Sequence, residues 1–236
     1  MKKAWALLTA VLLLVSATGC GGTGSDQTSG DSQQGASAAS YKVGIVQYME
    51  HNALDAATQG FQDALKEKLG DDVAFDVQNA QGEATNCTTI ASKFVNDGVD
   101  LILANATPAA QAAAQATGDI PIIGTSITDY VSAGLVKDDK APGGNVTGTS
   151  DLNPIKEQVS LLKTLCPDVQ TVGILYCSAE KNSEVQVELA TEEFEAQGIT
   201  VQTYAAADSN ELQSVVTKAA SENDALYIPT DNLLAN

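Results

Sequence analysis

The chain has 236 residues and a formal net charge of −18, and all 12 of its basic residues are lysines. This acidic balance argues against nucleic-acid binding, because a phosphate backbone would be repelled. Without arginine the chain has no planar guanidinium clamp, so an anionic ligand has to be held by backbone N–H groups, hydroxyls, amides or lysine. The single histidine, His51, excludes a histidine-rich metal site, and we expect neither a metal nor a cofactor.

Residues 1–20 have the three parts of a bacterial lipoprotein export signal. Two lysines give a positive start, residues 4–15 are apolar but shorter than the ~20 residues of a membrane helix, and small residues lead to Cys20. We expect lipidation of Cys20; an ordinary secretory signal is the alternative. Residues 21–40, rich in Gly, Ser and Gln, predict a flexible tether. The mature protein is then expected outside the cytoplasm, anchored to the cell membrane by its lipid.

Residues 41–150 alternate short β-rich runs with amphipathic segments, which is typical of a parallel sheet covered by helices. Continuous apolar runs predict strands at 42–47, 73–78, 100–104 and 120–123. Apolar side chains at helical spacing predict helices over 54–65, 87–95 and 109–116.

Residues 151–236 continue in the same manner. Helices are predicted over 155–165, 187–194 and 212–219, and strands at 172–176, 199–204 and 225–228. The two series echo each other, since the run that begins at Val43 recurs at Val172 and the run at Asp100 corresponds to that at Asp224. We therefore expect an α/β protein with two Rossmann-like lobes of like topology, 41–150 and 151–236. With only three strands in its second part, the chain is expected to be an N-terminal fragment with a truncated second lobe.

The cysteines after Cys20 have no metal-ligand spacing. Cys87 continues an apolar helical stripe and is expected to be a small buried hydrophobe. A disulfide between Cys166 and Cys177 is possible in an exported protein, but the sequence leaves this pairing open.

Ligands of open parallel sheets bind beyond the carboxyl ends of the strands. The loops at those ends concentrate amides, hydroxyls and acids, and several lead into helix N-termini, which attract anions. The candidates for holding a carboxylate are the hydroxyls of Thr107, Ser126, Thr128 and Ser183. The candidates for an ammonium are Asp129, Glu180 and Asp231. For each residue alone, an ordinary helix cap is the alternative.

Enzyme signatures are missing from the sequence. There is no Gly-x-Ser-x-Gly elbow, no Walker loop and no Gly-x-Gly-x-x-Gly after a strand. His51 has no marked nucleophile to activate and is interpreted as a solvated loop residue. We expect a binding protein rather than an enzyme.

The strand-end loops resemble a known family, the substrate-binding lipoproteins of ABC importers that bind tryptophan or tyrosine. The matching stretches are 46–47 with 51–55, 78–82, 106–111, 128–129, 142–148, 180–183 and 229–232. The resemblance implies a type I periplasmic-binding-protein fold that holds a small amino acid, of the tryptophan, tyrosine or phenylalanine kind, between hinged lobes. It also implies an ABC permease with its ATPase as partners. Where family members often have proline after the Thr-Asp pair, this chain has Tyr130, which is expected to reshape the cleft or add an aromatic wall.

Together the loops and the family motifs predict a set of ligand-binding residues: Gln47, His51, Asn79, Gln81, Thr107, Ser126, Thr128, Asp129, Glu180, Asn182, Ser183, Asp231 and Asn232. The expected mechanism is capture by closure of the lobes, with no bond chemistry. An extracytoplasmic sensor that presents its ligand to a signalling receptor is the alternative function, and an exported enzyme is a third.

Overall fold

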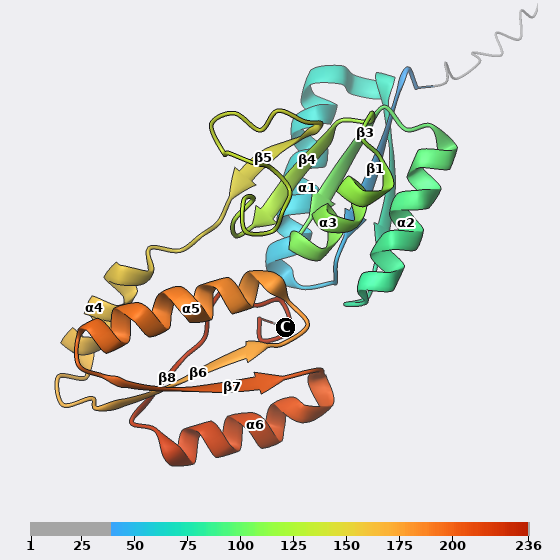
Figure 1. Cartoon of the computed structure of the whole chain (residues 1–236). Helices are drawn as coiled ribbons and strands as arrows, with labels where there is room; N and C mark the ends of the chain where they lie inside the picture. The colour runs from blue at the N-terminus through green and yellow to red at the C-terminus, as the bar shows by residue number, and fades with distance from the viewer. Residues whose placement is uncertain (1–38, 236) are drawn as a thin grey trace, which may run out of the picture. The chain divides into compact units, whose positions relative to one another are not determined.

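The computed structural model describes residues 39–235 (Figure 1). The predicted export signal, its Cys20 and residues 21–38 of the predicted tether lie outside this range. Within residues 39–235, no helix combines the length and the apolar character that crossing a membrane requires.

The first part of the described chain, residues 41–150, is called here the N-terminal unit. It contains a five-stranded, all-parallel sheet of order β2-β1-β3-β4-β5. The strands are β1 (Tyr41–Gln47), β2 (Val73–Asn79), β3 (Leu101–Asn105), β4 (Ile122–Ile127) and β5 (Val146–Ser150). The helices are α1 (Asn52–Leu69), α2 (Ala84–Asp97) and α3 (Thr107–Ala116), with a short 3-10 turn at Gly70–Asp72.

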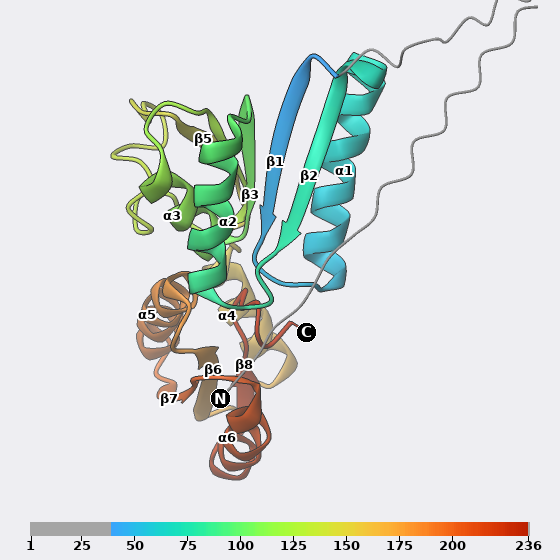
Figure 2. The ribbon, with the colours of Figure 1, turned by 90° about the vertical axis from the view of Figure 1, so that its right-hand side faces the viewer.

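Helices cover both faces of this sheet (Figure 2). On one face, Phe61 and Leu65 of α1 pack on the buried strand residues Ile45 and Leu103. On the other face, α2 and α3 form a second cluster in which Phe94 is fully buried. Burial on both faces explains why β1 and β3 are continuous apolar runs rather than alternating ones.

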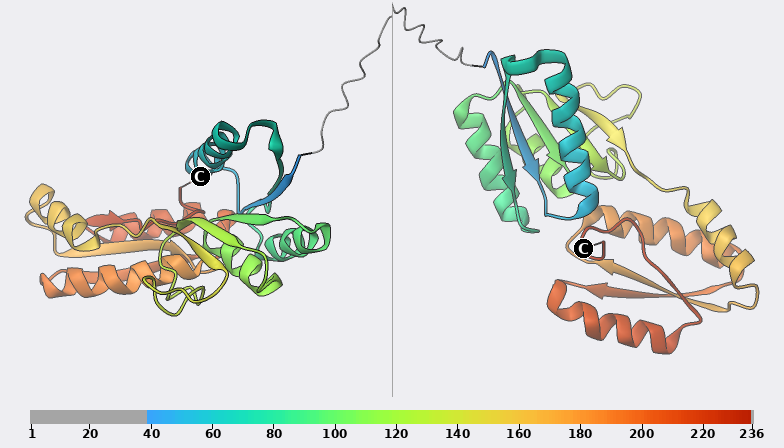
Figure 3. Two further views of the ribbon diagram at one scale, coloured as in Figure 1. Left: turned by 90° about the horizontal axis from the view of Figure 1, so that it is seen from above. Right: turned by 180° about the vertical axis from the view of Figure 1, so that it is seen from behind.

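The second part, residues 155–235, is called here the C-terminal unit. Its sheet has three parallel strands in the order β7-β6-β8. The elements are α4 (Ile155–Leu165), β6 (Thr171–Cys177), α5 (Lys181–Ala196), β7 (Thr200–Ala206), α6 (Ser209–Glu222) and β8 (Ala225–Tyr227). Helices α4 and α5 pack on one face and α6 on the other, as the right-hand view of Figure 3 shows for α5 and α6.

The echo between the two series of elements is confirmed in three dimensions. The order β2-β1-β3 recurs as β7-β6-β8. An aspartate clamps the start of the central strand in both units: Asp100 Oδ2 accepts the Lys42 N–H at 2.7 Å, and Asp224 Oδ2 accepts the Thr171 N–H at 2.9 Å. The Gln170 N–H also donates to Asp224, and these bonds lower the pKa of its carboxyl.

The α/β class is confirmed, and every predicted strand and helix is present. Their ends agree to within about four residues except at α5, which begins six residues before the predicted helix, and one strand was missed. Strand β5 has no apolar run, because a single residue, Val146, is buried in it and the other four are exposed. The end of β4 was also missed. There the pairing with β5 shifts register between Gly124 and Ile127, and this bulge interrupts the pattern of the strand.

The disulfide that the sequence left open is not formed. Cys166 and Cys177 are free thiols, the first exposed and the second buried. Cys177 ends β6 and Cys166 precedes its start, and a seven-residue strand spans roughly 20 Å, far beyond the ~7 Å that a disulfide tolerates between Cα atoms. Cys87 is fully buried, as predicted, and its burial raises the thiol pKa to about 11.

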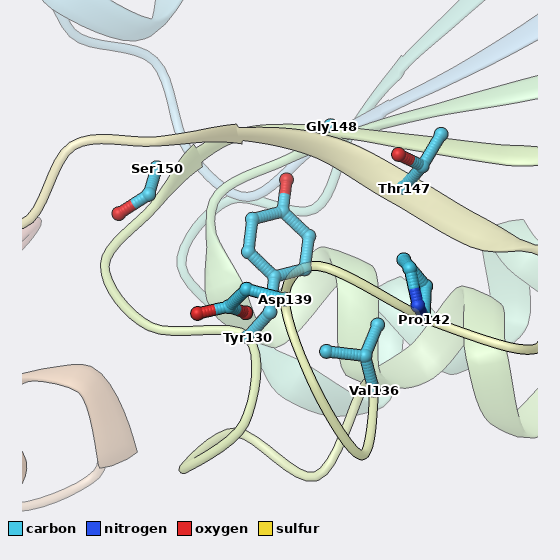
Figure 4. A pocket seen from close by; sticks show the side chains of 7 residues that line it. All are labelled: Tyr130, Val136, Asp139, Pro142, Thr147, Gly148 and Ser150. Carbon is cyan, nitrogen blue, oxygen red and sulfur yellow. The ribbon is translucent and has the colours of Figure 1, made fainter.

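Tyr130 lies beneath β5 and braces it (Figure 4). Its hydroxyl donates to the carbonyls of Gly124, at 2.9 Å, and Thr149, at 3.2 Å. The ring fits because its neighbours are glycines: a Cβ added at Gly148 would lie 2.2 Å from the Tyr130 hydroxyl. Tyr130 lines a cavity of about 170 Å³ with residues of the 136–150 segment. Tyr130 lines neither of the two cavities described below, so it adds no aromatic wall to them.

Replacing Gly148 by alanine should destabilise the protein strongly. The new methyl group would lie 2.0 Å from the Gly124 carbonyl oxygen, so β4 and β5 would have to separate, at a cost of about 2 kcal/mol or more. Gly60→Ala is the matched control: Gly60 is an exposed helix residue with open space around its Cα, and alanine there should stabilise by about 0.5–1 kcal/mol. Urea unfolding measures both. Equal effects of the two substitutions would contradict the bracing of β5.

Asp224→Asn should make the stability of the folded protein less dependent on pH in the acidic range. Because the folded pKa of Asp224 is lowered, its contribution is present above the unfolded pKa of about 3.9 and is lost as pH falls through the folded pKa. The difference in thermal midpoint between pH 7 and pH 3.5 should therefore be smaller in Asp224→Asn than in the unmodified protein. Asp71→Asn, on the exposed 3-10 turn, provides the control for removal of one surface charge. If the thermal midpoint of Asp224→Asn fell between pH 7 and pH 3.5 by as much as that of the unmodified protein, the charge of Asp224 would contribute nothing to stability.

Candidate functional site

The carboxyl ends of the strands in each unit meet at one edge of its sheet. In the order β2-β1-β3, the connections from β1 and β3 leave toward opposite faces, which opens a crevice at their carboxyl ends. The order β7-β6-β8 produces the same arrangement at the ends of β6 and β8. The loops predicted to bind ligand follow these strands.

A cavity of about 460 Å³ is lined by strand-end loops of both units. It includes two of the predicted residues, Gln81 and Glu180. The lining residues are Tyr48, Met49, Gln81, Gly82, Glu83 and Ala84 from the N-terminal unit and Cys177, Ala179, Glu180, Ala207, Asp208, Ser209 and Leu233 from the C-terminal unit. Its walls thus combine an aromatic ring, a thioether and small apolar groups with a few acids.

A smaller cavity of about 110 Å³ shares the loops after β1, β6 and β8 with the large one and adds the ends of β4 and β5, and it is lined by six of the predicted residues. These are His51, Ser126, Thr128, Asn182, Asp231 and Asn232. The remaining lining residues are Ala53, Leu54, Asp151, Thr230 and Ala235. Eight of the eleven lining residues have polar side chains, and the lining residues come from the ends of β1, β4, β5 and β8 and from the start of α5.

Backbone strain is concentrated at the same sheet edge. The described non-glycine residues with positive φ are Gln81 at 57°, Ala106 at 85° and Ser126 at 56°, which lie at the ends of β2, β3 and β4. Such conformations cost about 1–3 kcal/mol each and persist only where surrounding contacts enforce them. Ser126 lies in the bulge of β4, which turns this residue to the small cavity.

Two buried carboxylates organise the loop after β8. Glu180 is 1% exposed, and its Oε2 accepts the N–H and the side-chain amide of Asn232 at 3.1 and 2.6 Å, while its Oε1 accepts the Leu233 N–H. Asp231 is 2% exposed; its Oδ2 accepts the Cys177 N–H at 2.6 Å and the Ser183 hydroxyl at 2.7 Å. Burial, and then the charge of Asp231, raise the pKa of Glu180.

The oxygens of Asp231 and Glu180 are thus engaged by the protein itself. Asp231 Oδ1 accepts the Leu234 N–H at 3.0 Å, and the Asp231 carbonyl accepts the Ala235 N–H, which makes a single helical turn at the end of the described chain. None of the described residues that line the two cavities is a lysine or an arginine. The electrostatic character of the site is therefore negative.

One predicted residue, Gln47, serves as an internal support. Gln47 donates to the Met49 carbonyl at 2.8 Å and to Asp55 Oδ1 at 2.6 Å, and accepts the Thr58 hydroxyl at 2.6 Å. Asn105, which is fully buried, donates to the same Thr58 hydroxyl at 2.9 Å. This network fixes the β1–α1 loop, which carries Tyr48 and His51.

The other predicted residues have simpler roles. Asn79 Oδ1 accepts the Gln81 N–H at 2.7 Å, and Asp129 Oδ1 accepts the Ser132 N–H at 2.6 Å, so both cap turns. Thr107, the first residue of α3, is 2% exposed and its hydroxyl has no partner among the described residues, yet it lines neither cavity.

Sequence reasoning missed eleven of the thirteen residues that line the large cavity and five of the eleven that line the small one. Tyr48 lies in a loop that the sequence singled out and lines the large cavity. Asp151 follows β5, the strand that had no recognisable pattern, and lines the small cavity. Burial raises the pKa of Asp151, as well as that of Tyr48, for which the charge of Glu180 adds to the shift.

Gln47→Ala should destabilise the protein by about 1–3 kcal/mol without any ligand, because the substitution leaves the Thr58 hydroxyl and the Met49 carbonyl without their partner. Gln59→Ala, on the same helix as Thr58, breaks only an exposed bond to Asp63 and should cost under about 0.5 kcal/mol. Denaturant unfolding of the ligand-free protein measures both. Equal stability of the two variants would show that Gln47 does not support the loop.

Comparisons with known proteins identify the family of the chain. The model of the family described as ABC transporter substrate binding protein matches residues 42–236. The chain is 41% identical over 239 residues to the tyrosine-binding protein of Clostridioides difficile strain R20291, a match that covers 100% of this chain and 69% of that protein.

Solved structures agree with this match. The ABC domain of Streptococcus pneumoniae in complex with L-Trp is 45% identical, with a TM-score of 0.80 over 84% of this chain and 68% of that one. A ligand-free, open substrate-binding protein with adhesive properties from Clostridium difficile is 43% identical, with a TM-score of 0.59 over 82% and 67% of the two chains. The predicted periplasmic-binding-protein fold is confirmed, and the chain belongs to the ABC transporter substrate-binding protein family.

Proposed function

We propose that this protein is the extracytoplasmic solute-binding component of an ABC importer and captures an aromatic amino acid between two lobes. The N-terminal unit and the C-terminal unit would be these lobes, divided near residue 150. The observation that carries the proposal is the small polar cavity, because both units supply its hydrogen-bonding groups. A ligand that bonds to groups of both units there would stabilise the arrangement in which the units are close together.

The mixture of groups in the small cavity suits a zwitterion. The hydroxyls of Ser126 and Thr128 offer donors to a carboxylate, and the oxygens of Asp151 and Asn182 offer acceptors to an ammonium. A volume of about 110 Å³ accommodates the charged head of an amino acid but not a large side chain. The remainder of the ligand would then extend into the larger cavity.

The larger cavity suits an aromatic side chain. Its volume of about 460 Å³ lies within the roughly 300–1,000 Å³ range of small-molecule sites. Tyr48 and Met49 offer ring-edge and sulfur contacts, both of which favour an aromatic partner. The relatives support this ligand class, since one is named as a tyrosine-binding protein and another was crystallised with L-Trp.

Capture would proceed by closure of the lobes. The two solved relatives are 45% and 43% identical to this chain, yet their TM-scores with it are 0.80 and 0.59, and the first holds L-Trp while the second is ligand-free and open. Relatives at equal sequence distance that differ this much in TM-score differ in conformation from each other. A hinged clamp has this property, and the ligand selects the closed form through its extra contacts.

The remaining parts of the proposal concern location and partners. Lipid attached to Cys20 would anchor the protein to the membrane, and residues 21–40 would let the clamp stand off the surface. The closed form would deliver its ligand to a membrane permease that works with an ATPase. No step makes or breaks a covalent bond of the ligand.

Titration of L-Trp into the processed protein should change the emission of the indole. The only tryptophan of the chain is Trp5, within the predicted signal, so after removal of residues 1–19 all indole fluorescence comes from the ligand. Transfer of the indole from water to an apolar cavity should shift its emission to shorter wavelength, and L-Tyr and L-Phe should reverse the shift by competition.

Mass spectrometry of ligand that co-purifies with the protein provides the independent check. An aromatic amino acid is the expected finding. Recovery of a sugar or a metal chelate, together with no emission shift on addition of L-Trp, would overturn the proposed function.

A further inference from the structure

We propose that Asp151 binds the ammonium group of the ligand and, from the crossing between the two units, links that contact to their closure. This inference rests on the function proposed above, since it assigns one role within the same site. It also differs from the prediction made from the sequence, which named Asp129, Glu180 and Asp231 as the candidates for an ammonium.

The three carboxylates predicted from the sequence are engaged by other groups. Glu180 accepts bonds from Asn182, Asn232 and Leu233. Asp231 accepts bonds on both oxygens, from Cys177 and Ser183 on Oδ2 and from Leu234 on Oδ1. An ammonium would have to compete with these donors, which hold the loop after β8 in place.

Asp129 is excluded for a different reason. It accepts the Ser132 N–H at 2.6 Å and lines neither of the two shared cavities. Its carboxylate therefore serves the turn that follows β4.

Asp151 has an acceptor that the described residues leave free. Its backbone N–H donates to the Ile127 carbonyl at 3.0 Å, which fixes the residue beside the end of β4. Its Oδ1 is buried, has no hydrogen-bond partner, and belongs to a residue that lines the small cavity. A buried, unpaired carboxylate oxygen is unfavourable, so a cationic partner in the cavity would relieve it. Burial raises the pKa of this carboxyl, although hydrogen bonds from its own backbone N–H and from the Thr128 side chain act in the opposite direction.

Two further unpaired atoms lie around the same cavity. The Asn182 amide group donates to Glu180 Oε2 at 3.2 Å and to the Thr230 carbonyl at 3.3 Å, which leaves its Oδ1 as an acceptor without a partner. His51 Nε2 is also buried and unpaired, and it accepts a bond when the ring proton is on Nδ1. An ammonium has three N–H donors, and these three residues offer one acceptor each.

The origin of the three acceptors connects binding to closure. His51 precedes α1 in the N-terminal unit, Asn182 lies in the first turn of α5 in the C-terminal unit, and Asp151 lies in the segment that joins the units. An ammonium bonded to all three would tie both units to their connection. A ligand without this group would lose the bonds that require the units to be close.

The test compares two ligands that differ only in the ammonium. L-Trp and indole-3-propionate share their indole and carboxylate, and both are followed by their own emission. A hydrogen bond to a charged group contributes enough that its loss weakens binding about 10- to 100-fold. Asp151→Asn should therefore weaken binding of L-Trp about 10-fold or more and leave binding of indole-3-propionate within about two-fold. The preserved affinity for indole-3-propionate also shows that the variant is folded.

The matched control is Asp129→Asn, which removes a carboxylate that follows the neighbouring strand β4 and lines neither cavity; both affinities should stay as in the unmodified protein. If Asp151→Asn keeps the full preference for L-Trp, or loses both ligands equally, the role of Asp151 is overturned while the proposed function stands. If the unmodified protein binds none of L-Trp, L-Tyr and L-Phe, the proposed function fails, and this inference fails with it.

Discussion

Burial of acidic side chains without any basic partner is the constraint on which the site depends. Glu180 and Asp231 are almost fully buried, and no lysine or arginine is among the described residues that line the cavities. Backbone N–H groups and neutral side chains donate hydrogen bonds to the two carboxylates and compensate their charge. The conformation of residues 177–183 and 231–234 is therefore set by the need to place these donors around Glu180 and Asp231. The result is a rigid electronegative wall that attracts a cationic group and offers it few free acceptors.

The architecture of the protein was largely predictable from its sequence. Strands buried on both faces, such as β1 and β3, are apolar along their length, and glycines mark the ends of α1 and α2. The relation between Asp100 and Asp224 was also visible as a repeat, although only the structure shows that each clamps the start of a central strand. Strand β5 was not predictable, because an edge strand with one buried residue has no periodic signal.

The site was predictable as a set of loops but not as a set of roles. The carboxyl-end rule pointed to the sheet edge where both cavities lie, and six predicted residues line the small cavity. A polar side chain at this edge either points into the cavity or bonds to other groups of the protein. Which of the two occurs depends on residues that are far away in the sequence. Gln47 is engaged through Thr58, which in turn is bonded to Asn105, 47 residues further on. Asp151 was missed because the role proposed for it rests on an acceptor atom, Oδ1, that has no hydrogen-bond partner among the described residues. A sequence does not show which acceptors stay unpaired.

The brace formed by Tyr130 has an evolutionary consequence. The phenol occupies space that only glycine leaves free at 124 and 148, because a Cβ at either position would lie within 2.5 Å of its hydroxyl. These three positions cannot drift independently. Gly148 carries a second constraint, because a Cβ there would also lie 2.0 Å from the Gly124 carbonyl oxygen, so it has to stay glycine even beside a smaller residue at position 130. Gly124, for which the tyrosine hydroxyl is the first obstacle to a Cβ, is the position expected to change together with the tyrosine among related proteins.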